Sequence, residues 1–193
     1  NARKEQGKLN EAIDAYKKAL SINPKYSRAY NNIGNALKDQ GKLDEAIEAY
    51  NNSISINPQN PETYNNLGIT LRKQRKIKEA KAAFKKAILI KPDYAEAYNN
   101  MSNALQDQGK LEEAIKACEK SISLKPDSAL TYNNMGNILT DQGKLDEAIQ
   151  ACKKSISLKP DYAEAYLNMG VTLVEKGKLA EAIESFKKAS AIK

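Results

Sequence analysis

The sequence contains no histidine and no tryptophan, and cysteine occurs only twice. Without histidine, the chain lacks the side chain that most often serves as a general base or a metal ligand near neutral pH. The two cysteines, Cys118 and Cys152, are too few for a disulfide-stapled fold or a zinc site. We therefore expect no catalytic residue, no metal and no cofactor, and we expect both cysteines to be buried free thiols.

Long apolar runs are also missing, and none approaches the roughly 20 residues that a membrane-spanning helix needs. The first residues show no signal-peptide pattern. Because free thiols suit a reducing compartment, we expect a cytoplasmic rather than a secreted protein. The chain opens with Asn1 and not with Met, so we also expect it to be a fragment or a processed chain.

Proline is sparse but periodic. Five of the six prolines recur every 34 residues, at Pro24, Pro58, Pro92, Pro126 and Pro160. The text around them repeats too, since residues 39–47 and 141–149 both read DQGKLDEAI, and residues 121–127 and 155–161 both read SISLKPD. Self-similarity at a fixed period of this length indicates an array of structural repeats.

Placing each periodic proline at position 32 divides the chain into repeats. A partial repeat, 1–26, is followed by five repeats at 27–60, 61–94, 95–128, 129–162 and 163–193. Position 4 is tyrosine in all five, at Tyr30, Tyr64, Tyr98, Tyr132 and Tyr166. Position 8 is small, at Gly34, Gly68, Ser102, Gly136 and Gly170, and position 20 is always alanine. This 34-residue pattern resembles the tetratricopeptide repeat, and the resemblance covers the whole chain.

The resemblance implies an all-α fold, a right-handed superhelical solenoid of antiparallel helix–turn–helix hairpins, in a single array over residues 1–193. The residues are consistent with it. Tyr30, Ile33 and Leu37 recur at the spacing of one helix face. Gly41 suits a tight turn before a second helix, and Pro58 ends that helix. The small residues at positions 8 and 20 are expected to let the two helices of a hairpin approach closely.

The net charge of +7 raises nucleic acid or an anionic membrane as a possible partner. Much of the lysine, however, lies late in the second helices and acids cluster at their starts, which complements the helix dipole without any ligand. We assign the position-4 tyrosines to the core rather than to base stacking, so the pattern disfavours nucleic acid. One basic cluster is the exception, at Arg72, Lys73, Arg75, Lys76 and Lys78. It is either a contact for an anion or acidic partner, or drift in one turn where Arg75 replaces the usual glycine.

Asparagine is concentrated in the first helix of each repeat, which lines the concave surface in tetratricopeptide arrays. Position 6 is always asparagine, at Asn32, Asn66, Asn100, Asn134 and Asn168. Position 5 is asparagine at Asn31, Asn65, Asn99 and Asn133, and position 9 is asparagine at Asn35, Asn103 and Asn137. Because asparagine is a mediocre helix former, this concentration asks for a reason.

A carboxamide both donates and accepts hydrogen bonds, so a column of them can pair with the backbone of an extended peptide. The column resembles the one in the repeat arm of O-linked N-acetylglucosamine transferases, which implies a groove for extended protein segments. At position 6 we leave open whether the asparagines contact a ligand or pack between repeats, whereas at positions 5 and 9 we expect ligand contact. Repeat domains that clamp acidic chaperone tails carry cations at position 5 and, in a later repeat, at positions 2 and 6. This set is missing here, so that resemblance is rejected.

The last repeat departs from the asparagine pattern. Leu167, Val171 and Val174 replace polar residues of the expected groove at spacing i, i+4 and i+7. This apolar stripe is either an anchor pocket for a partner or a surface that an element downstream covers.

We therefore predict a protein-interaction scaffold, and no enzyme, that binds an extended peptide or protein segment in its concave groove. The alternative is the substrate-recognition arm of a larger enzyme such as a glycosyltransferase. Self-association through uncapped ends is a third hypothesis, because terminal repeats normally need a polar cap.

Overall fold

The computed structural model describes residues 2–192, and it describes side chains from Gly7 onward. Within this range the chain forms eleven α-helices and no β-strand, so the all-α prediction is confirmed. The partial repeat forms one helix, α1 (Ala2–Ile22). Each following repeat forms two, namely α2 (Ser27–Asp39) and α3 (Leu43–Ile56), α4 (Pro61–Lys73) and α5 (Ile77–Ile90), α6 (Ala95–Gln106) and α7 (Leu111–Leu124), α8 (Ala129–Asp141) and α9 (Leu145–Leu158), and α10 (Ala163–Glu175) and α11 (Leu179–Ala191).

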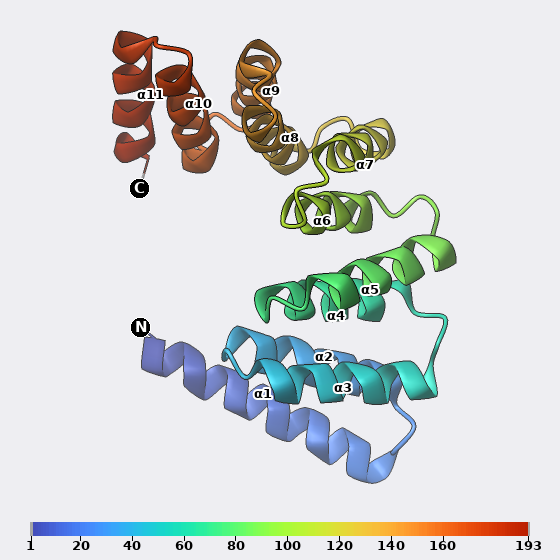
Figure 1. Ribbon diagram of the computed structural model, residues 1–193. Helices are drawn as coiled ribbons and strands as arrows, with labels where there is room; N and C mark the ends of the chain where they lie inside the picture. The colour runs from blue at the N-terminus through green and yellow to red at the C-terminus, as the bar shows by residue number, and fades with distance from the viewer. Residues whose placement is uncertain (1, 193) are drawn as a thin grey trace. The chain divides into compact units, whose positions relative to one another are not determined.

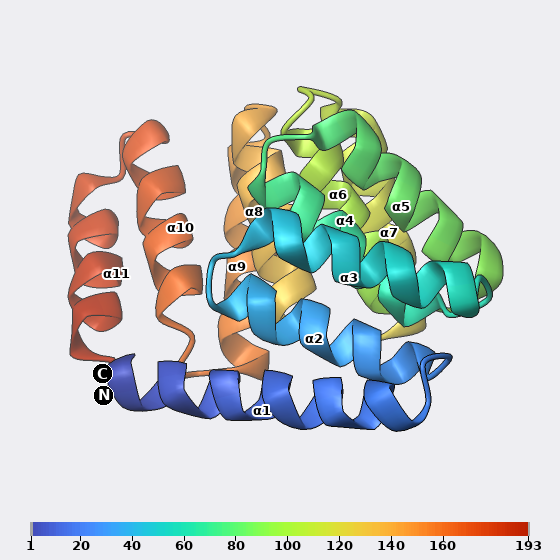
Figure 2. The same cartoon turned by 90° about the horizontal axis from the view of Figure 1, so that it is seen from below.

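These helices fall into two compact units, residues 1–92 and residues 93–193. Unit 1 holds α1 to α5. Its helices pack in chain order, with the turns inside hairpins at one end and the loops between hairpins at the other (Figure 1). Helix α1 lies along α2 (Figure 2). Unit 2 holds α6 to α11. First helices of successive repeats contact each other in both units, as α2 and α4 do in unit 1 and as α6 and α8, and α8 and α10, do in unit 2. A single array across both units stays a prediction.

The turn inside each hairpin depends on one backbone conformation. Gly41, Gly109, Gly143 and Gly177 have φ between 71° and 79°, in the left-handed region that glycine tolerates best. In the first complete repeat the Gly41 N–H donates to the Lys38 carbonyl and the Lys42 N–H donates to the Leu37 carbonyl, the pattern of a Schellman cap. The second repeat keeps the same turn with Arg75, whose φ is 63°.

Close packing inside each hairpin depends on position 8. An added Cβ at Gly34 would lie 2.5 Å from the Tyr50 ring, and one at Gly68 would lie 2.5 Å from the Phe84 ring. Where position 24 is the smaller Cys118, position 8 can be Ser102. The expected close approach of the two helices is therefore confirmed. The repeat with serine at position 8 has a cysteine at position 24, although an added Cβ at Gly136 would also lie 2.7 Å from the sulfur of Cys152.

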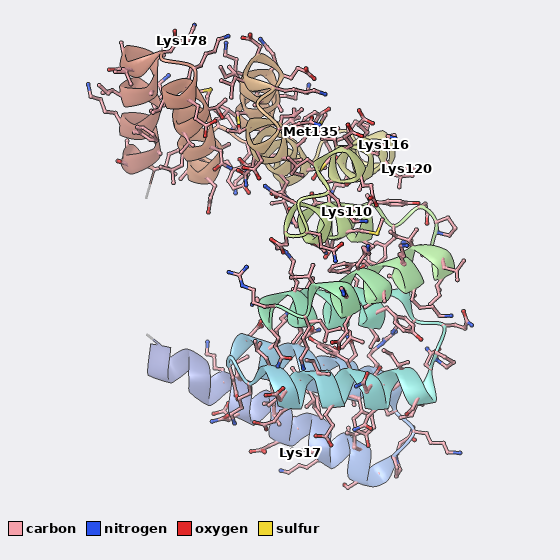
Figure 3. All side chains as sticks on the ribbon, viewed as in Figure 1. Lys17, Lys110, Lys116, Lys120, Met135 and Lys178 are labelled. Carbon is pink, nitrogen blue, oxygen red and sulfur yellow. The ribbon has the colours of Figure 1, made fainter. Side chains whose placement is uncertain are left out.

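Neighbouring hairpins share their apolar side chains. In unit 2, Leu105, Cys118 and Ile138 belong to one buried cluster, and Met135 of α8 packs against it (Figure 3). The position-4 tyrosines, which we assigned to the core, are only half-buried. This assignment was wrong in degree, because a phenol hydroxyl gains by staying close to water while its ring packs.

Candidate peptide-binding face

The asparagines of positions 5 and 6 are joined between successive repeats. The Asn66 carboxamide donates to Oδ1 of Asn31 over 3.3 Å. In unit 2, Asn134 donates to Asn99 over 3.0 Å and Asn168 donates to Asn133 over 2.9 Å. Each of these bonds runs from position 6 of one first helix to position 5 of the first helix before it. We call these three bonds the amide pairs.

Burial separates the two members of each pair. The position-5 side chains are almost fully covered, with exposed fractions of 3%, 0%, 3% and 6% for Asn31, Asn65, Asn99 and Asn133. The position-6 asparagines are half-buried. A buried amide needs its hydrogen bonds satisfied, so the pairs stabilise the packing of first helices against each other. Of the two readings left open at position 6, inter-repeat packing is the one these bonds support. Ligand contact at positions 5 and 6 stays a prediction.

The position-9 asparagines differ from one another. Asn35 accepts a hydrogen bond from the Tyr50 hydroxyl over 2.8 Å, within its own hairpin. The pKa of Tyr50 is raised, chiefly because burial disfavours its charged form. Asn103 is half-buried and Asn137 is exposed. Among the position-9 asparagines, Asn137 is therefore the most accessible to a ligand.

Each unit carries a cavity at the junction of two repeats. The cavity in unit 1 measures about 480 Å³ and is lined by Arg28, Asn31, Asn32, Asn57, Gln59, Asn60, Pro61 and Glu62. The cavity in unit 2 measures about 400 Å³ and is lined by Ala95, Glu96, Asn99, Ser121, Lys125, Asp127, Ser128, Ala129, Leu130 and Thr131. Both use position 2 of two successive repeats, a position-5 asparagine and the loop between hairpins. We call them the inter-repeat cavities.

Sequence reasoning missed two contributors to these cavities. The first contributor is the loop around the periodic proline, which the sequence analysis did not connect with a binding site. In unit 1, Asn60 of this loop caps α4 by accepting from the Glu62 N–H. The second contributor, which lines the unit 2 cavity, is a buried hydroxyl layer. Ser121 lies 3.2 Å from the Thr131 hydroxyl and donates to the Ala95 carbonyl over 2.8 Å. Serine at position 27 followed ten residues later by threonine is the signal that would have found this layer.

The apolar stripe of the last repeat is open. Leu167, Val171 and Val174 are 45%, 47% and 46% exposed, and Leu179 and Ile183 of α11 are also exposed. Where a first helix is followed by another in the same unit, position 5 is buried and bonded to that next helix, as at Asn31, Asn99 and Asn133. The stripe therefore lies on the kind of face that a following helix covers elsewhere in the chain. Both interpretations of the stripe remain predictions.

The cysteines are buried free thiols, as expected. Burial raises the pKa of Cys118 and of Cys152 to about 11. Among the residues described, no group of histidine, cysteine, aspartate or glutamate side chains is arranged to hold a metal ion. The described helices also include none with the length and apolar character required to span a bilayer.

Several solved structures share this fold. A crystal structure of MamA is 33% identical, with a TM-score of 0.70, and the match covers 82% of this chain and 93% of that one. YrrB, described as a tetratricopeptide protein with an unusual peptide-binding site, is 24% identical over 94% of this chain and 93% of its own, with a TM-score of 0.69. The Cut9–Hcn1 assembly of the anaphase-promoting complex is 19% identical with a TM-score of 0.85, covering 96% of this chain and 37% of that one.

No curated protein sequence matches the chain. A family model does, and it spans all of it: the C-terminal domain of cilia and flagella-associated protein 70, a tetratricopeptide domain, matches residues 1–193. The narrower resemblance to O-linked N-acetylglucosamine transferases stays a prediction. With its repeat register, its hairpins and these matches together, the chain is a tetratricopeptide-repeat protein and belongs to the family of the cilia and flagella-associated protein 70 C-terminal domain.

Proposed function

We propose that the chain is a protein-interaction scaffold that holds an extended protein segment along its first helices, with side chains of that segment entering the inter-repeat cavities. The observation that carries the proposal is the recurrence of one cavity at the same repeat positions in both units. A site that recurs with the repeat suits a ligand that is itself periodic, and an extended polypeptide is such a ligand.

The amide pairs support this role by fixing the first helices against each other. A binding surface that is already ordered loses less conformational entropy when the ligand arrives. Because the position-5 carboxamides are held from behind by position 6, their orientation is set before binding. Exposed side chains near the position-5 asparagines, such as Asn137, are therefore attached to helices whose packing is already fixed.

The two inter-repeat cavities differ in chemistry. In unit 1, the position-2 residues are Arg28 and Glu62, and the remaining lining is mostly carboxamide. In unit 2, position 2 is Glu96 and Leu130, and the Leu130 side chain is exposed. An exposed leucine at a cavity rim favours an apolar side chain in the partner, whereas the unit 1 cavity favours a polar one.

The relatives support the general role. YrrB is described as having a peptide-binding site, and it shares this fold along nearly its whole length. The alternative, a substrate-recognition arm of a larger enzyme, would use the same face in the same way. An experiment on the binding face therefore tests a feature that both hypotheses require.

A dodecapeptide library displayed on phage would be selected against the immobilised chain, and one selected peptide would be titrated by fluorescence anisotropy. Leu130→Glu is expected to weaken binding about tenfold or more, since it places a charge in the apolar part of the cavity. Asn137→Ala is expected to weaken it less, because a single exposed hydrogen bond is lost.

The control variant is Lys154→Glu, a surface change on α9 away from the cavity lining, which should leave the affinity within about twofold. Circular dichroism would verify that all three variants keep their helicity. Failure to select any peptide would overturn the proposal, and so would a selected peptide whose affinity is unchanged both by the cavity variant Leu130→Glu and by the first-helix variant Asn137→Ala.

A further inference from the structure

The turn between α4 and α5 is strongly basic, whereas the equivalent turns of three other repeats carry more acids than bases. We call Arg72, Lys73, Arg75, Lys76 and Lys78 the basic turn. Only one acid, Glu79, lies among residues 72–79. At position 13 the other repeats carry an acid, at Asp39, Asp107, Asp141 and Glu175, where this repeat has Lys73. At position 18 Lys78 stands where three repeats have Asp44, Glu112 and Asp146.

The basic turn is fixed in shape and open to solvent. The Arg75 N–H donates to the Arg72 carbonyl over 2.9 Å, and the Lys76 N–H donates to the Leu71 carbonyl over 3.0 Å. Lys73, Arg75, Lys76 and Lys78 are exposed. The Gln74 carboxamide donates to the Asp44 carboxylate over 2.8 Å, which ties this turn to the preceding turn of unit 1. The charges therefore stand on an ordered loop.

Two of these residues work against folding. Arg75 adopts φ of 63°, where a residue with a Cβ costs about 1–2 kcal/mol relative to the usual region. Lys78 sits in the first turn of α5, where the helix dipole already presents positive charge and the other second helices carry acids. Folding alone does not favour either residue. Both residues are positively charged and both are unfavourable for folding, and this combination is better explained by a binding role.

Positive charge here has a further source. The N–H groups at the start of α5 point toward the same turn, and they add a partial positive charge to that of the side chains. Residues 72–79 contain no aromatic side chain on which a nucleic-acid base could stack. The chemistry therefore favours carboxylates over nucleobases.

We propose that the basic turn is a docking site for an acidic polypeptide segment. This site is separate from the inter-repeat cavity of unit 1. Pro61 and Glu62 line that cavity at the start of α4, whereas the basic turn follows the end of the same helix. A helix of 13 residues places the two about 20 Å apart. The inference therefore does not depend on the proposed function of the cavities.

The test replaces the basic turn by the residues that other repeats use at the same positions. The variant is Lys73→Asp/Arg75→Gly/Lys78→Asp. Because each new residue is found in this turn of other repeats, we expect the variant to be at least as resistant to urea as the parent. A loss of binding would then not result from unfolding. A matched control, Lys85→Glu/Lys86→Glu, removes a similar charge from exposed positions of α5.

Fluorescence anisotropy would compare three probes at low and at physiological salt: octaglutamate, octaglutamine and a single-stranded oligothymidine. Octaglutamate is expected to bind the parent and the control, with affinity falling as salt rises, and to bind the turn variant about tenfold or more weakly. Equal binding of octaglutamate to parent and turn variant would overturn the proposal. So would tighter binding of oligothymidine than of octaglutamate, or no preference for octaglutamate over octaglutamine.

Discussion

Asparagine has two roles in this chain, and single residues show how they are divided. In the three amide pairs the position-5 asparagine is buried and accepts, and the position-6 asparagine is half-buried and donates. Position 9 ranges from the bonded Asn35 to the exposed Asn137. The concentration of asparagine could be read from the sequence, but the sequence did not show which asparagines are buried and which are exposed. Whether Asn99 meets Asn134 depends on how two repeats stack, and residues 35 positions apart carry no local sign of that contact.

Removal of one member of an amide pair should cost stability. Asn99→Ala leaves the Asn134 donor without its buried acceptor, and we expect a loss of about 1–2 kcal/mol in the free energy of unfolding. Asn137→Ala, at an exposed position, should change it by less than about 0.5 kcal/mol.

Urea denaturation of Asn99→Ala, Asn134→Ala and the double variant would measure this prediction. A coupling of about 0.5 kcal/mol or more between the two sites is expected. Strict additivity of the two single effects would show that the bond contributes nothing to the repeat junction.

At the scale of helices and hairpins, the sequence predicted much of what is observed. Each repeat from 27 onward contains two helices, and the glycine of position 15 forms the turn between them in four of the five. Local signals sufficed because helix periodicity, left-handed glycine and proline act within a few residues. The partial repeat differs, since Gly7 occupies position 15 but lies inside α1. The inter-repeat cavities escaped prediction because loop, helix start and preceding helix meet there only after stacking.

The fit between positions 8 and 24 can be tested by one substitution in two hairpins. Gly34→Ser would press its Cβ against the Tyr50 ring and should cost about 1–3 kcal/mol. Gly136→Ser brings its Cβ to 2.7 Å from the sulfur of Cys152, and it should cost less, since Ser102 already stands opposite Cys118 in the preceding hairpin.

Thermal and urea unfolding followed by circular dichroism would rank the two variants. Both changes replace glycine by serine inside a helix, so differences in helix propensity cancel between them. An equal or greater loss for Gly136→Ser would contradict this expected order.

At the scale of the whole molecule, the two units carry different ionisable groups in their interiors. Unit 2 contains both cysteines, and burial raises their folded pKa from 9.0 to about 11. Between these values the unfolded chain releases thiol protons that the folded chain retains. The unfolded state then binds fewer protons, so stability falls as pH rises through this window.

We therefore expect unit 2 to lose stability between about pH 9 and pH 11, and Cys118→Ala/Cys152→Ala to show a weaker loss over the same range. Hydrogen exchange measured at α7 and α9, which carry the two thiols, would follow this. At pH 8 both thiols should react with iodoacetamide far more slowly in the native chain than in denaturant. Rapid alkylation of the native chain would contradict the burial described.

The amide pairs also bear on how freely the repeats can be recombined. As far as this bond alone is concerned, a hairpin with asparagine at position 5 can precede any hairpin with asparagine at position 6. The last repeat does not meet this condition, because Leu167 offers no acceptor to the hairpin placed after it. If this repeat were placed before another one, the position-6 carboxamide of the following repeat would lack its hydrogen-bond acceptor. A designer who reorders these repeats would therefore need to restore asparagine at Leu167 wherever that repeat is placed before another one.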